Sequence, residues 1–407
     1  MKNTKIIIVG AGLAGISLAY FLKSKSLAIF EKEKEAGGLC RSQRIGKFIF
    51  DYGGHLLHFR GPFFGGLIRK LLKQRMVCSR RQAFIYFRKK MVPYPFQFFY
   101  QQRGSHTVPP KEKIDYVKIS NFSQWCQSMF SRDIFEYFFY PYNYKFWGVP
   151  LERLDYKWAE RFVPYKKSRP LGYNWRFFYP QQGIRELIQA FLKKINAPLN
   201  LGFKIKEIDI ERRKVRFANS FVANYSRLYL SLPLAELPRL IKSLPRRIIN
   251  DLGKLKSTSI YVLNLGLSRR LSKFGHWIYF PQRNISFFRI GFPSNFSSGV
   301  SPRGYGSLYA EVSLASGDSI NKEQLEKKII ADLVSLGIIR EKDIVERLGI
   351  FIKYAYPLPL LGKDKIVEEV EKFLSRYGIY LIGRYGRWQY YSMEDVVLGS
   401  WRLVGER

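Results

Sequence analysis

The chain has very few cysteine and histidine residues. Its three cysteines, Cys40, Cys78 and Cys126, are scattered over 407 residues, and none of its four histidines forms a ligand-spaced pair on a predicted helix. So few cysteines exclude a disulfide framework or a zinc ribbon and favour a reducing compartment. The scarcity of both residue types argues against a metal site.

Long hydrophobic runs are also missing. The most apolar stretch, residues 6–22, follows Lys2 and Lys5 and could be taken for a targeting segment, but small and polar residues interrupt it and no small-x-small cleavage site follows. No other stretch approaches the about 20 apolar residues that a membrane-spanning helix requires. We therefore expect a cytoplasmic protein.

Acidic residues are scarce as well. The chain has 32 Asp and Glu against 69 Lys and Arg, which gives a formal net charge of +37. Such a charge attracts nucleic acid, an anionic membrane surface or a phosphorylated substrate. Because the basic residues are spread along the whole chain, we do not expect nucleic acid as a partner. Peripheral association with an anionic membrane is left open.

Aromatic residues, by contrast, are abundant. They make up 16% of the chain and cluster in residues 93–100, 135–147 and 173–179. Any one cluster is most simply explained by core packing. Three clusters interleaved with Asn, Gln and Arg indicate instead a cleft that stacks a planar group and bonds its edges. A chain of this length can bury two or three linked cores.

The first part of the chain carries a dinucleotide-binding motif. Residues 6–9 read as a buried strand, and Gly10, Gly12 and Gly15 follow with the spacing that permits a tight turn, close approach of a pyrophosphate and close helix packing. Glu31 ends a second strand, 21 residues after Gly10, where its carboxylate can bind both ribose hydroxyls. Strand, glycines, helix, strand and acid together predict a dinucleotide cofactor.

The rest of the pattern predicts a fold built from separated segments. Two glycine turns flank a short hairpin at 44–50, and residues 114–161 have a helical, aromatic pattern. Apolar and polar residues alternate in several later stretches, which predicts antiparallel β structure there. These stretches are 201–221, 259–267, 276–280, 286–292 and 305–312. An amphipathic helix is expected after them, at 322–336. Near the end, a buried strand runs into Gly383, which would admit a pyrophosphate that Arg384 would neutralise.

We therefore predict an α/β fold with a discontinuous Rossmann-like FAD-binding domain, a helical domain and an antiparallel β-sheet domain. The FAD-binding domain is expected from residues 1–90, 170–235 and 346–407. The helical substrate domain is expected at 91–169 and the sheet domain at 236–345.

Several further segments, in this order, resemble the UDP-galactopyranose mutase family, closest to its eukaryotic-type branch and within the amine-oxidase-like flavoproteins. The segments are GGL (37–39), DYGGH (51–55), VPYPFQ (92–97), PYNYKFWGVP (141–150), Glu160-Arg161, Asn174 ahead of FYP (178–180), WIYFP (277–281) with Arg289, YPLP (356–359) and GRYGRWQY (383–390). The first and last are widespread among these flavoproteins, whereas the others are specific to the mutases.

The resemblance implies an isomerase that interconverts UDP-galactopyranose and UDP-galactofuranose with no net redox change, in cell-surface polysaccharide biosynthesis. It implies that FAD is active in its reduced form, through a covalent adduct between the sugar and flavin N5. The substrate partner is then a UDP-sugar, although related sugars would require only a few changed hydroxyl contacts. A homodimer is left open.

The resemblance also assigns roles to individual residues. It assigns diphosphate binding to Arg161 and Arg289, with added hydroxyl contacts from Tyr279, Tyr356 and Tyr390. The chemistry agrees, because one guanidinium group can bind two phosphate oxygens. It assigns uridine binding to aromatic and amide side chains, and it places Trp277 beside the substrate. The residues assigned to uridine are Tyr94, Phe96, Gln97, Tyr142, Asn143 and Trp147.

For the flavin, the family pattern places His55 next to N5 after Gly53 and Gly54, and Asn174 near the sugar hydroxyls. Further cofactor contacts are expected from Gly38, Leu39 and Met393, although the segment after Tyr390 departs from the family pattern. Two alternatives remain: an amine-oxidase-like FAD oxidase or desaturase, and a basic nucleic-acid or membrane-surface protein on a degenerate flavin fold.

Overall fold

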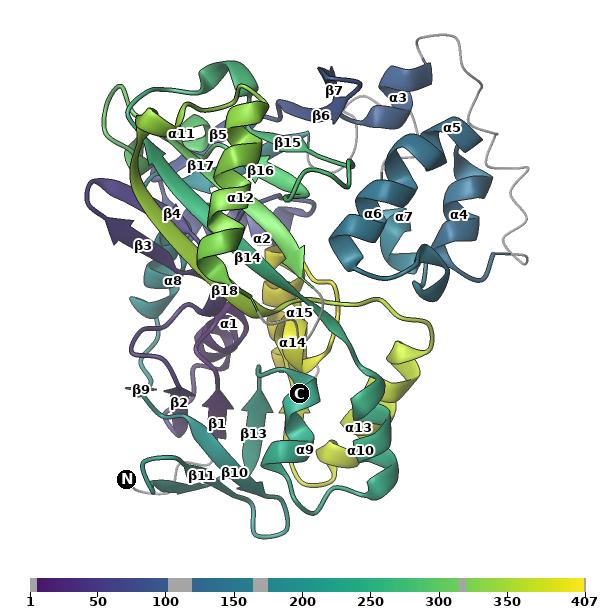
Figure 1. Ribbon diagram of the computed structural model, residues 1–407. Helices are drawn as coiled ribbons and strands as arrows, with labels where there is room; N and C mark the ends of the chain where they lie inside the picture. Colours follow the sequence, from purple (N-terminus) through teal and green to yellow (C-terminus); the bar gives the residue numbers. More distant parts are fainter. Residues whose placement is uncertain (1–5, 102–118, 164–174, 315–319, 406–407) are drawn as a thin grey trace.

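The computed structural model describes residues 6–101, 119–163, 175–314 and 320–405. Figure 1 shows a parallel sheet in the lower half, a larger antiparallel sheet above it and a group of helices to one side. The predicted combination of a Rossmann-like domain assembled from separate stretches, a helical region and an antiparallel sheet is thus confirmed.

The parallel sheet has five strands in the order β19-β13-β1-β2-β9. Alternate residues of its central strands enter different cores: Ile7 and Phe30 join the cluster on one face, whereas Ile8 and Ile29 join the cluster on the other. Both faces are covered, which explains the continuous apolar runs in the sequence. The strands are β1 (Ile6–Val9), β2 (Leu27–Glu31), β9 (Leu199–Leu201), β13 (Arg227–Leu230) and β19 (Ile379–Leu381).

The larger sheet has seven strands in the order β18-β14-β17-β16-β15-β6-β7. Neighbours are antiparallel except β15 and β6, which pair in parallel. Helix α12 (Lys322–Ser335) packs Ile329 and Leu333 on one face of the sheet. The strands are β6 (Ala83–Phe87), β7 (Lys90–Pro93), β14 (Ser257–Leu267), β15 (Trp277–Tyr279), β16 (Arg289–Gly291), β17 (Gly306–Leu314) and β18 (Ile344–Pro357).

Smaller sheets and helices complete the two sheet regions. The small sheets pair β3 (Ser42–Ile45) with β4 (Phe48–Asp51), β5 (Met76–Arg80) with β8 (Arg176–Pro180), and β10 (Ile205–Asp209) with β11 (Lys214–Phe217) and β12 (Val222–Asn224). The helices are α1 (Leu13–Leu22), α2 (Pro62–Leu72), α8 (Arg185–Leu192), α9 (Leu237–Leu240), α10 (Arg246–Lys254), α11 (Pro293–Phe296), α13 (Lys363–Ser375), α14 (Gly383–Gly386) and α15 (Met393–Gly405).

The helical region contains an unusual π-helical turn. Residues Phe135–Phe139 widen the helix between α5 and α6, just before Pro141, which has no N–H to donate to the preceding turn. π-Helical turns occur frequently at functional sites. The helices here are α3 (Phe96–Gln101), α4 (Phe122–Met129), α5 (Arg132–Ile134), α6 (Tyr140–Trp147) and α7 (Lys157–Phe162).

Sheet membership departs from the expected segments at residues 83–93, 344–357 and 237–254. Residues 83–93 and 344–357 add strands β6, β7 and β18 to the seven-stranded sheet, almost wholly outside the expected 236–345. Residues 237–254 form α9 and α10, which pack with the parallel sheet instead. Residues 205–224 form a sheet of their own. Local patterns identified these elements, but the sheet that each one joins depends on long-range pairing.

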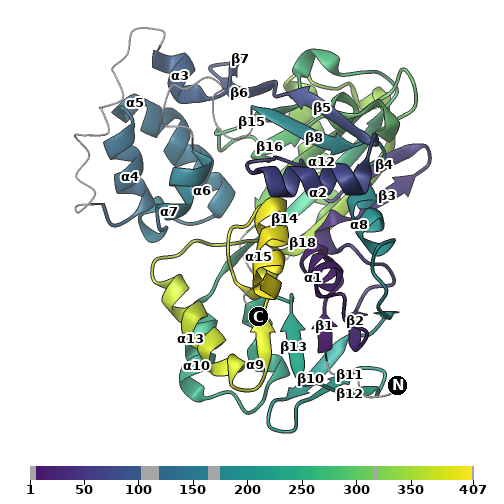
Figure 2. The same ribbon diagram turned by 180° about the vertical axis from the view of Figure 1, so that it is seen from behind.

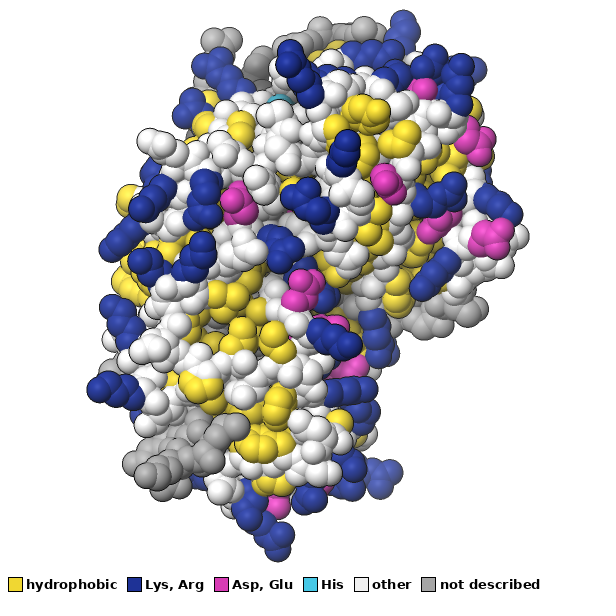
Figure 3. Space-filling view, turned by 90° about the vertical axis from the view of Figure 1, so that its left-hand side faces the viewer, with side chains coloured by type: hydrophobic (Ala, Val, Ile, Leu, Met, Phe, Trp, Pro, Cys, Tyr) yellow, Lys and Arg dark blue, Asp and Glu magenta, His cyan; other side chains and the backbone are white. Residues whose placement is uncertain are grey.

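The surface is basic over a broad area. Figure 3 shows Lys and Arg side chains scattered across one face, with fewer Asp and Glu between them and no single basic band. No helix within the described ranges is long and apolar enough to cross a membrane. Over the same ranges, no group of three or more His, Cys, Asp or Glu residues is arranged to hold a metal ion.

Candidate active site

A cavity of about 290 Å³ lies where the helical region, the seven-stranded sheet and the loop after β4 meet. The structure brings together in its lining most of the side chains that the sequence assigned to substrate and flavin. These residues are Leu39, Gly54, His55, Tyr94, Gln97, Tyr142, Asn143, Trp277, Tyr279, Arg289, Tyr356, Arg384, Tyr390 and Met393.

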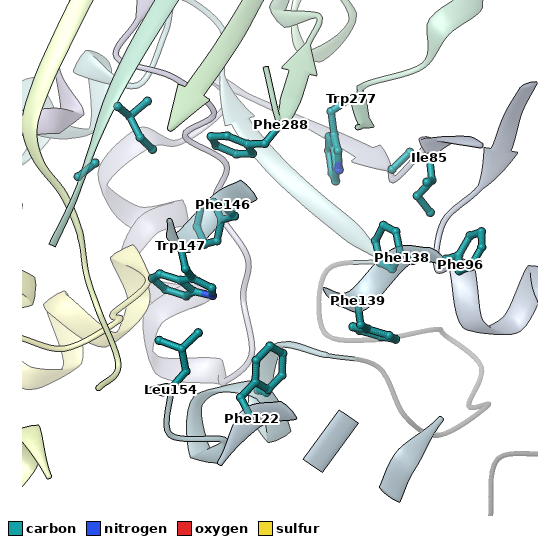
Figure 4. Packing of buried hydrophobic residues seen from close by; sticks show 14 of the residues in the cluster. Ile85, Phe96, Phe122, Phe138, Phe139, Phe146, Trp147, Leu154, Trp277 and Phe288 are labelled. Atoms are coloured by element: carbon teal, nitrogen blue, oxygen red, sulfur yellow. The ribbon is translucent and has the colours of Figure 1, made fainter. Parts of the chain in front are cut away.

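Some predicted site residues lie elsewhere. Phe96 and Trp147 are fully buried in the aromatic core behind the cavity, as Figure 4 shows, with Phe96 beside Phe138 and Trp147 near Phe146. Their predicted contact with uridine is therefore not direct in this structure. Arg161 belongs to α7, but its side chain lies outside the described part of the chain, as does the whole of Asn174.

The predicted dinucleotide cradle is formed by glycine backbone. Gly12 bridges Gly37, and a Cβ on Gly38 would come within 3.2 Å of the Gly12 Cα. A Cβ on Gly15 would lie only 2.0 Å from the Gly10 carbonyl oxygen, so α1 can pack against β1 only with glycine there. A backbone this closely packed, opening at a helix N-terminus, fits the pyrophosphate of a dinucleotide.

Two further groups complete this cradle. The Glu31 carboxylate accepts hydrogen bonds from the backbone N–H of Ala11 at 2.7 Å and of Glu33 at 3.1 Å. A carboxylate has about four acceptor positions, so capacity remains for ribose hydroxyls. Gly383 follows β19 with φ of 72°, and a Cβ there would lie 2.5 Å from Ala14 Cβ, which brings the C-terminal element against α1.

Arg289 is held at the cavity by a buried carboxylate. Its Nε donates to Glu311 Oε2, and the side chains are 21% and 4% exposed. The second oxygen of Glu311 accepts a longer bond, 3.4 Å, from the N–H of Gly54. Glu311 thereby links Arg289 to the loop that carries His55, and Gly53 is required because a Cβ there would lie 2.7 Å from Glu311 Oε1.

His55 is a neutral imidazole at physiological pH. Burial, and next the nearby Arg384 guanidinium, lower the pKa of His55 to about 4. Its Nδ1 is buried without a hydrogen bond of good geometry to a described residue, although the backbone of Gly53 lies close enough to oppose the lowering of its pKa. A buried polar atom without a hydrogen-bond partner lowers stability unless a ligand supplies the missing hydrogen bond. This atom therefore fits a cofactor placed in the cavity.

Tyrosine rings surround Arg289. The rings of Tyr94 and Tyr142 contact that of Tyr279 at centroid distances of 5.2 and 5.4 Å, and those of Tyr356 and Tyr390 are 5.5 Å apart. Burial raises the pKa of Tyr279 and Tyr390, so both hydroxyls keep their protons and can donate hydrogen bonds to an anion.

Arg384 lines the cavity, directly after Gly383. Its Nε and a terminal nitrogen donate to the Tyr391 carbonyl at 2.9 and 2.6 Å, and its guanidinium is 5.3 Å from the Tyr356 ring centre. Met393 also lines the cavity, with its sulfur 3.8 Å from the Cys40 sulfur. The pyrophosphate role that the sequence assigns to Arg384 stays a prediction.

The π-helical turn orients Asn143. The Asn143 amide donates at 2.8 Å to the carbonyl of Phe139, the last residue of that turn. One edge of this amide is therefore occupied within the helix, which leaves its oxygen for other partners. Gln97, which is 1% exposed, is the second amide of the lining.

Sequence reasoning did not identify Glu311, Tyr309 or Lys145. Glu311 and Tyr309 are two residues apart on β17 and hence on one face; a single carboxylate in an apolar strand was the available signal. Lys145 Nζ donates to the carbonyls of Phe280, Gln282 and Phe287 at 3.1, 2.8 and 2.6 Å. It fixes α6 to the loop between β15 and β16, which no sequence pattern indicates.

Comparison with known proteins gives the following matches. The model of the NAD(P)-binding Rossmann-like domain family matches residues 8–73. dTDP-fucopyranose mutase of Escherichia coli is 21% identical over 230 residues, covering 51% of this chain and 59% of that protein. UDP-galactopyranose mutase of Mycoplasma pneumoniae is 25% identical over 246 residues, covering 52% and 58%. The chain thus matches less than two thirds of the length of these relatives.

A solved structure extends the similarity to nearly the whole chain. The crystal structure of a reduced UDP-galactopyranose mutase superposes with a TM-score of 0.86 and 25% identity, covering 99% of this chain and 93% of that one. Sequence and fold therefore agree in relating this chain to the UDP-galactopyranose mutases.

Proposed function

We propose that this protein is an FAD-dependent nucleotide-sugar mutase that interconverts UDP-galactopyranose and UDP-galactofuranose with no net redox change. The observation that carries the proposal is the largely buried Arg289, fixed by Glu311 and surrounded by tyrosines. Glu311 pairs with Nε and so makes burial of the cation tolerable, while the terminal nitrogens of Arg289 make no hydrogen bond to a described residue and can bind an anionic ligand. An apolar substrate has no use for this group.

The cofactor proposal rests on the glycine cradle, Glu31 and the buried Nδ1 of His55. Reduced FAD, when bound, supplies the nucleophile that displaces the nucleoside diphosphate from the anomeric carbon. His55, which is neutral because its pKa is about 4, can exchange a hydrogen bond with the ring system without adding a charge. Leu39 and Met393 add apolar side chains to the lining of the same space.

Arg289 has the main role in charge stabilisation. As the diphosphate departs it gains negative charge, and a guanidinium held in place by Glu311 stabilises this charge without reorganisation. The hydroxyls of Tyr279, Tyr356 and Tyr390 can add neutral donors around it. Arg161 is proposed as the second diphosphate ligand and Asn174 as a sugar ligand, both on the family pattern alone.

The nucleotide end is proposed to lie against α6. Tyr142 and Tyr94 offer aromatic faces to a pyrimidine, and the amides of Gln97 and Asn143 can pair with its polar edge. The two relatives are named for different nucleotide sugars. One name contains UDP and galactopyranose, and the other contains dTDP and fucopyranose. Both nucleotide sugars therefore belong in the first assay.

The test is anaerobic. Purified protein is reduced with dithionite and mixed with UDP-galactofuranose or dTDP-fucofuranose, and the products are separated by chromatography, with oxidised protein alongside. We expect conversion to the pyranose only in the reduced state. Bound FAD and UDP binding without conversion of either sugar would contradict the proposed reaction, and absence of UDP binding would favour the amine-oxidase-like oxidase or desaturase.

Arg289→Lys tests the site directly. Lysine keeps a charge for Glu311 but cannot hold two phosphate oxygens, so UDP affinity should fall at least about tenfold, a typical loss for one charge-assisted hydrogen bond. Arg283→Ala, an exposed change in the loop between β15 and β16, is the matched control and should bind UDP normally. Equal affinities for the two variants would remove the main support for the proposal. A cytoplasmic location and a homodimer stay predictions.

A further inference from the structure

Three aromatic rings from the helices α1, α2 and α15 meet at the surface. Phe63 of α2 and Trp401 of α15 are 38% and 44% exposed, with ring centres 4.4 Å apart. Phe21, at the end of α1, lies 6.3 Å from Phe63. Figure 2 shows α2 crossing above α15 and α1 on this side. These rings form an apolar contact area that remains open to solvent.

Exposed cations lie on, or just beyond the ends of, the helices that carry these rings and of α8, which packs against α1 and α2. On α2, Phe63 and Lys70 are seven residues apart and so lie on the same exposed side, Lys73 follows the last residue of the helix, and Trp401 is followed by Arg402. None of these cations is in an ion pair with a described residue. The cations are Lys23, Lys25, Lys70, Lys73, Lys193 and Arg402.

Acidic groups are nearly absent from the same helices. Residues 52–111 contain no Asp or Glu, and neither does α1. The acids of α15, Glu394 and Asp395, lie at its first turn and are paired with Arg60 at 2.8 and 2.6 Å. They are about two turns from Trp401, or roughly 10 Å along the helix. The face is therefore cationic around an aromatic centre.

We propose that this face, defined by Phe21, Phe63 and Trp401 with the six exposed cations, binds peripherally to an anionic phospholipid surface. Trp and Phe favour the boundary between headgroups and acyl chains, where an apolar ring is buried and polar groups stay wet. Each Lys or Arg near such a surface adds attraction that falls off over a Debye length. A negatively charged bilayer matches both features, and the inference is independent of the proposed enzymatic function.

The test is cosedimentation of the FAD-bound protein with vesicles of phosphatidylcholine, with and without phosphatidylglycerol, at physiological salt. We expect binding only to the anionic vesicles. The uncharged double variant Phe63→Ser with Trp401→Ser should bind at least about tenfold more weakly, because two interfacial rings are lost. Lys70→Glu with Lys73→Glu should weaken binding at least as much.

Matched controls separate this face from the general charge of +37. Phe351→Ser removes a ring of β18 that is 42% exposed, and Lys365→Glu with Lys372→Glu makes the same charge change on α13. Both controls should bind vesicles almost as wild type does. If the controls lose as much affinity as the face variants, the binding is unspecific and the proposal is overturned. It is also overturned if the face variants abolish only self-association in sedimentation velocity, because the face then binds a second copy.

Discussion

The substitution Gly12→Ala adds one methyl group, which should weaken cofactor binding and leave the fold intact. Gly12 precedes α1 with φ of −75° and ψ of −178°, which alanine adopts freely. A Cβ there would have the Gly38 Cα at 3.8 Å as its nearest neighbour, an ordinary contact. The protein without cofactor should therefore tolerate Gly12→Ala. Alanine caps a helix less well than glycine but also restricts the unfolded chain, so stability should change by less than about 1 kcal/mol.

The cofactor, in contrast, should not tolerate the methyl group. Gly12 is the glycine that lets backbone N–H groups approach the pyrophosphate. If the methyl group moves a phosphate by about 1 Å, two hydrogen bonds to a charged group lose their geometry, each worth about 1.5–3 kcal/mol. The loss of about 3–6 kcal/mol corresponds to a Kd for FAD that is roughly 10² to 10⁴ times higher.

The assay is FAD titration of the apoprotein by fluorescence quenching, together with thermal unfolding of the apoprotein. Gly66→Ala, on the exposed side of α2 with no atom within 4 Å of the added Cβ, is the control and should bind FAD normally. Gly15→Ala should fail to fold because of its 2.0 Å contact with the Gly10 oxygen. If Gly12→Ala binds FAD as tightly as wild type, the assignment of this turn to the pyrophosphate is wrong.

Two further predictions concern buried polar groups. Burial raises the pKa of Asp51 to about 6, so between pH 4 and 6 the folded state keeps a proton that the unfolded state has lost, and stability falls as pH rises. Asp51→Asn should remove about 3 kcal/mol of this pH dependence, measured by urea unfolding at both pH values; an unchanged slope would contradict the assignment. Lys145→Met leaves three carbonyls without their donor and should lower the free energy of unfolding by about 3 kcal/mol, with exposed Lys342→Met as the control. Equal unfolding midpoints for these two variants would show that the three bonds contribute nothing.

Local sequence patterns were sufficient to predict the elements whose geometry depends only on neighbouring residues. The strand at Ile6–Val9, the helix from Leu13 and the strand at Leu27–Glu31 follow directly from an apolar run, glycine spacing and an acid at fixed separation. The seven-stranded sheet was less predictable. Its strands were found from alternation, but β6 joins β15 across almost 200 residues, and no sequence pattern encodes that pairing.

The site shows the same division. Motifs found Arg289, His55 and Tyr356, because their neighbours in sequence are distinctive. Phe96 and Trp147 belong to the same motifs, yet they pack into the core, since a helix has an inner and an outer face and spacing alone does not say which faces the cavity.

The sequence by itself determined the glycine turn expected to hold the cofactor, most of the element types and about half of the residues that line the cavity, because these depend on short-range geometry and side-chain chemistry. Only the tertiary structure decided that Glu311 holds Arg289 and the Gly54 backbone together, that Lys145 joins α6 to the sheet, and that Phe63 and Trp401 meet on one face. Each of these contacts joins residues far apart in the chain, so it exists only after the sheets and helices have packed.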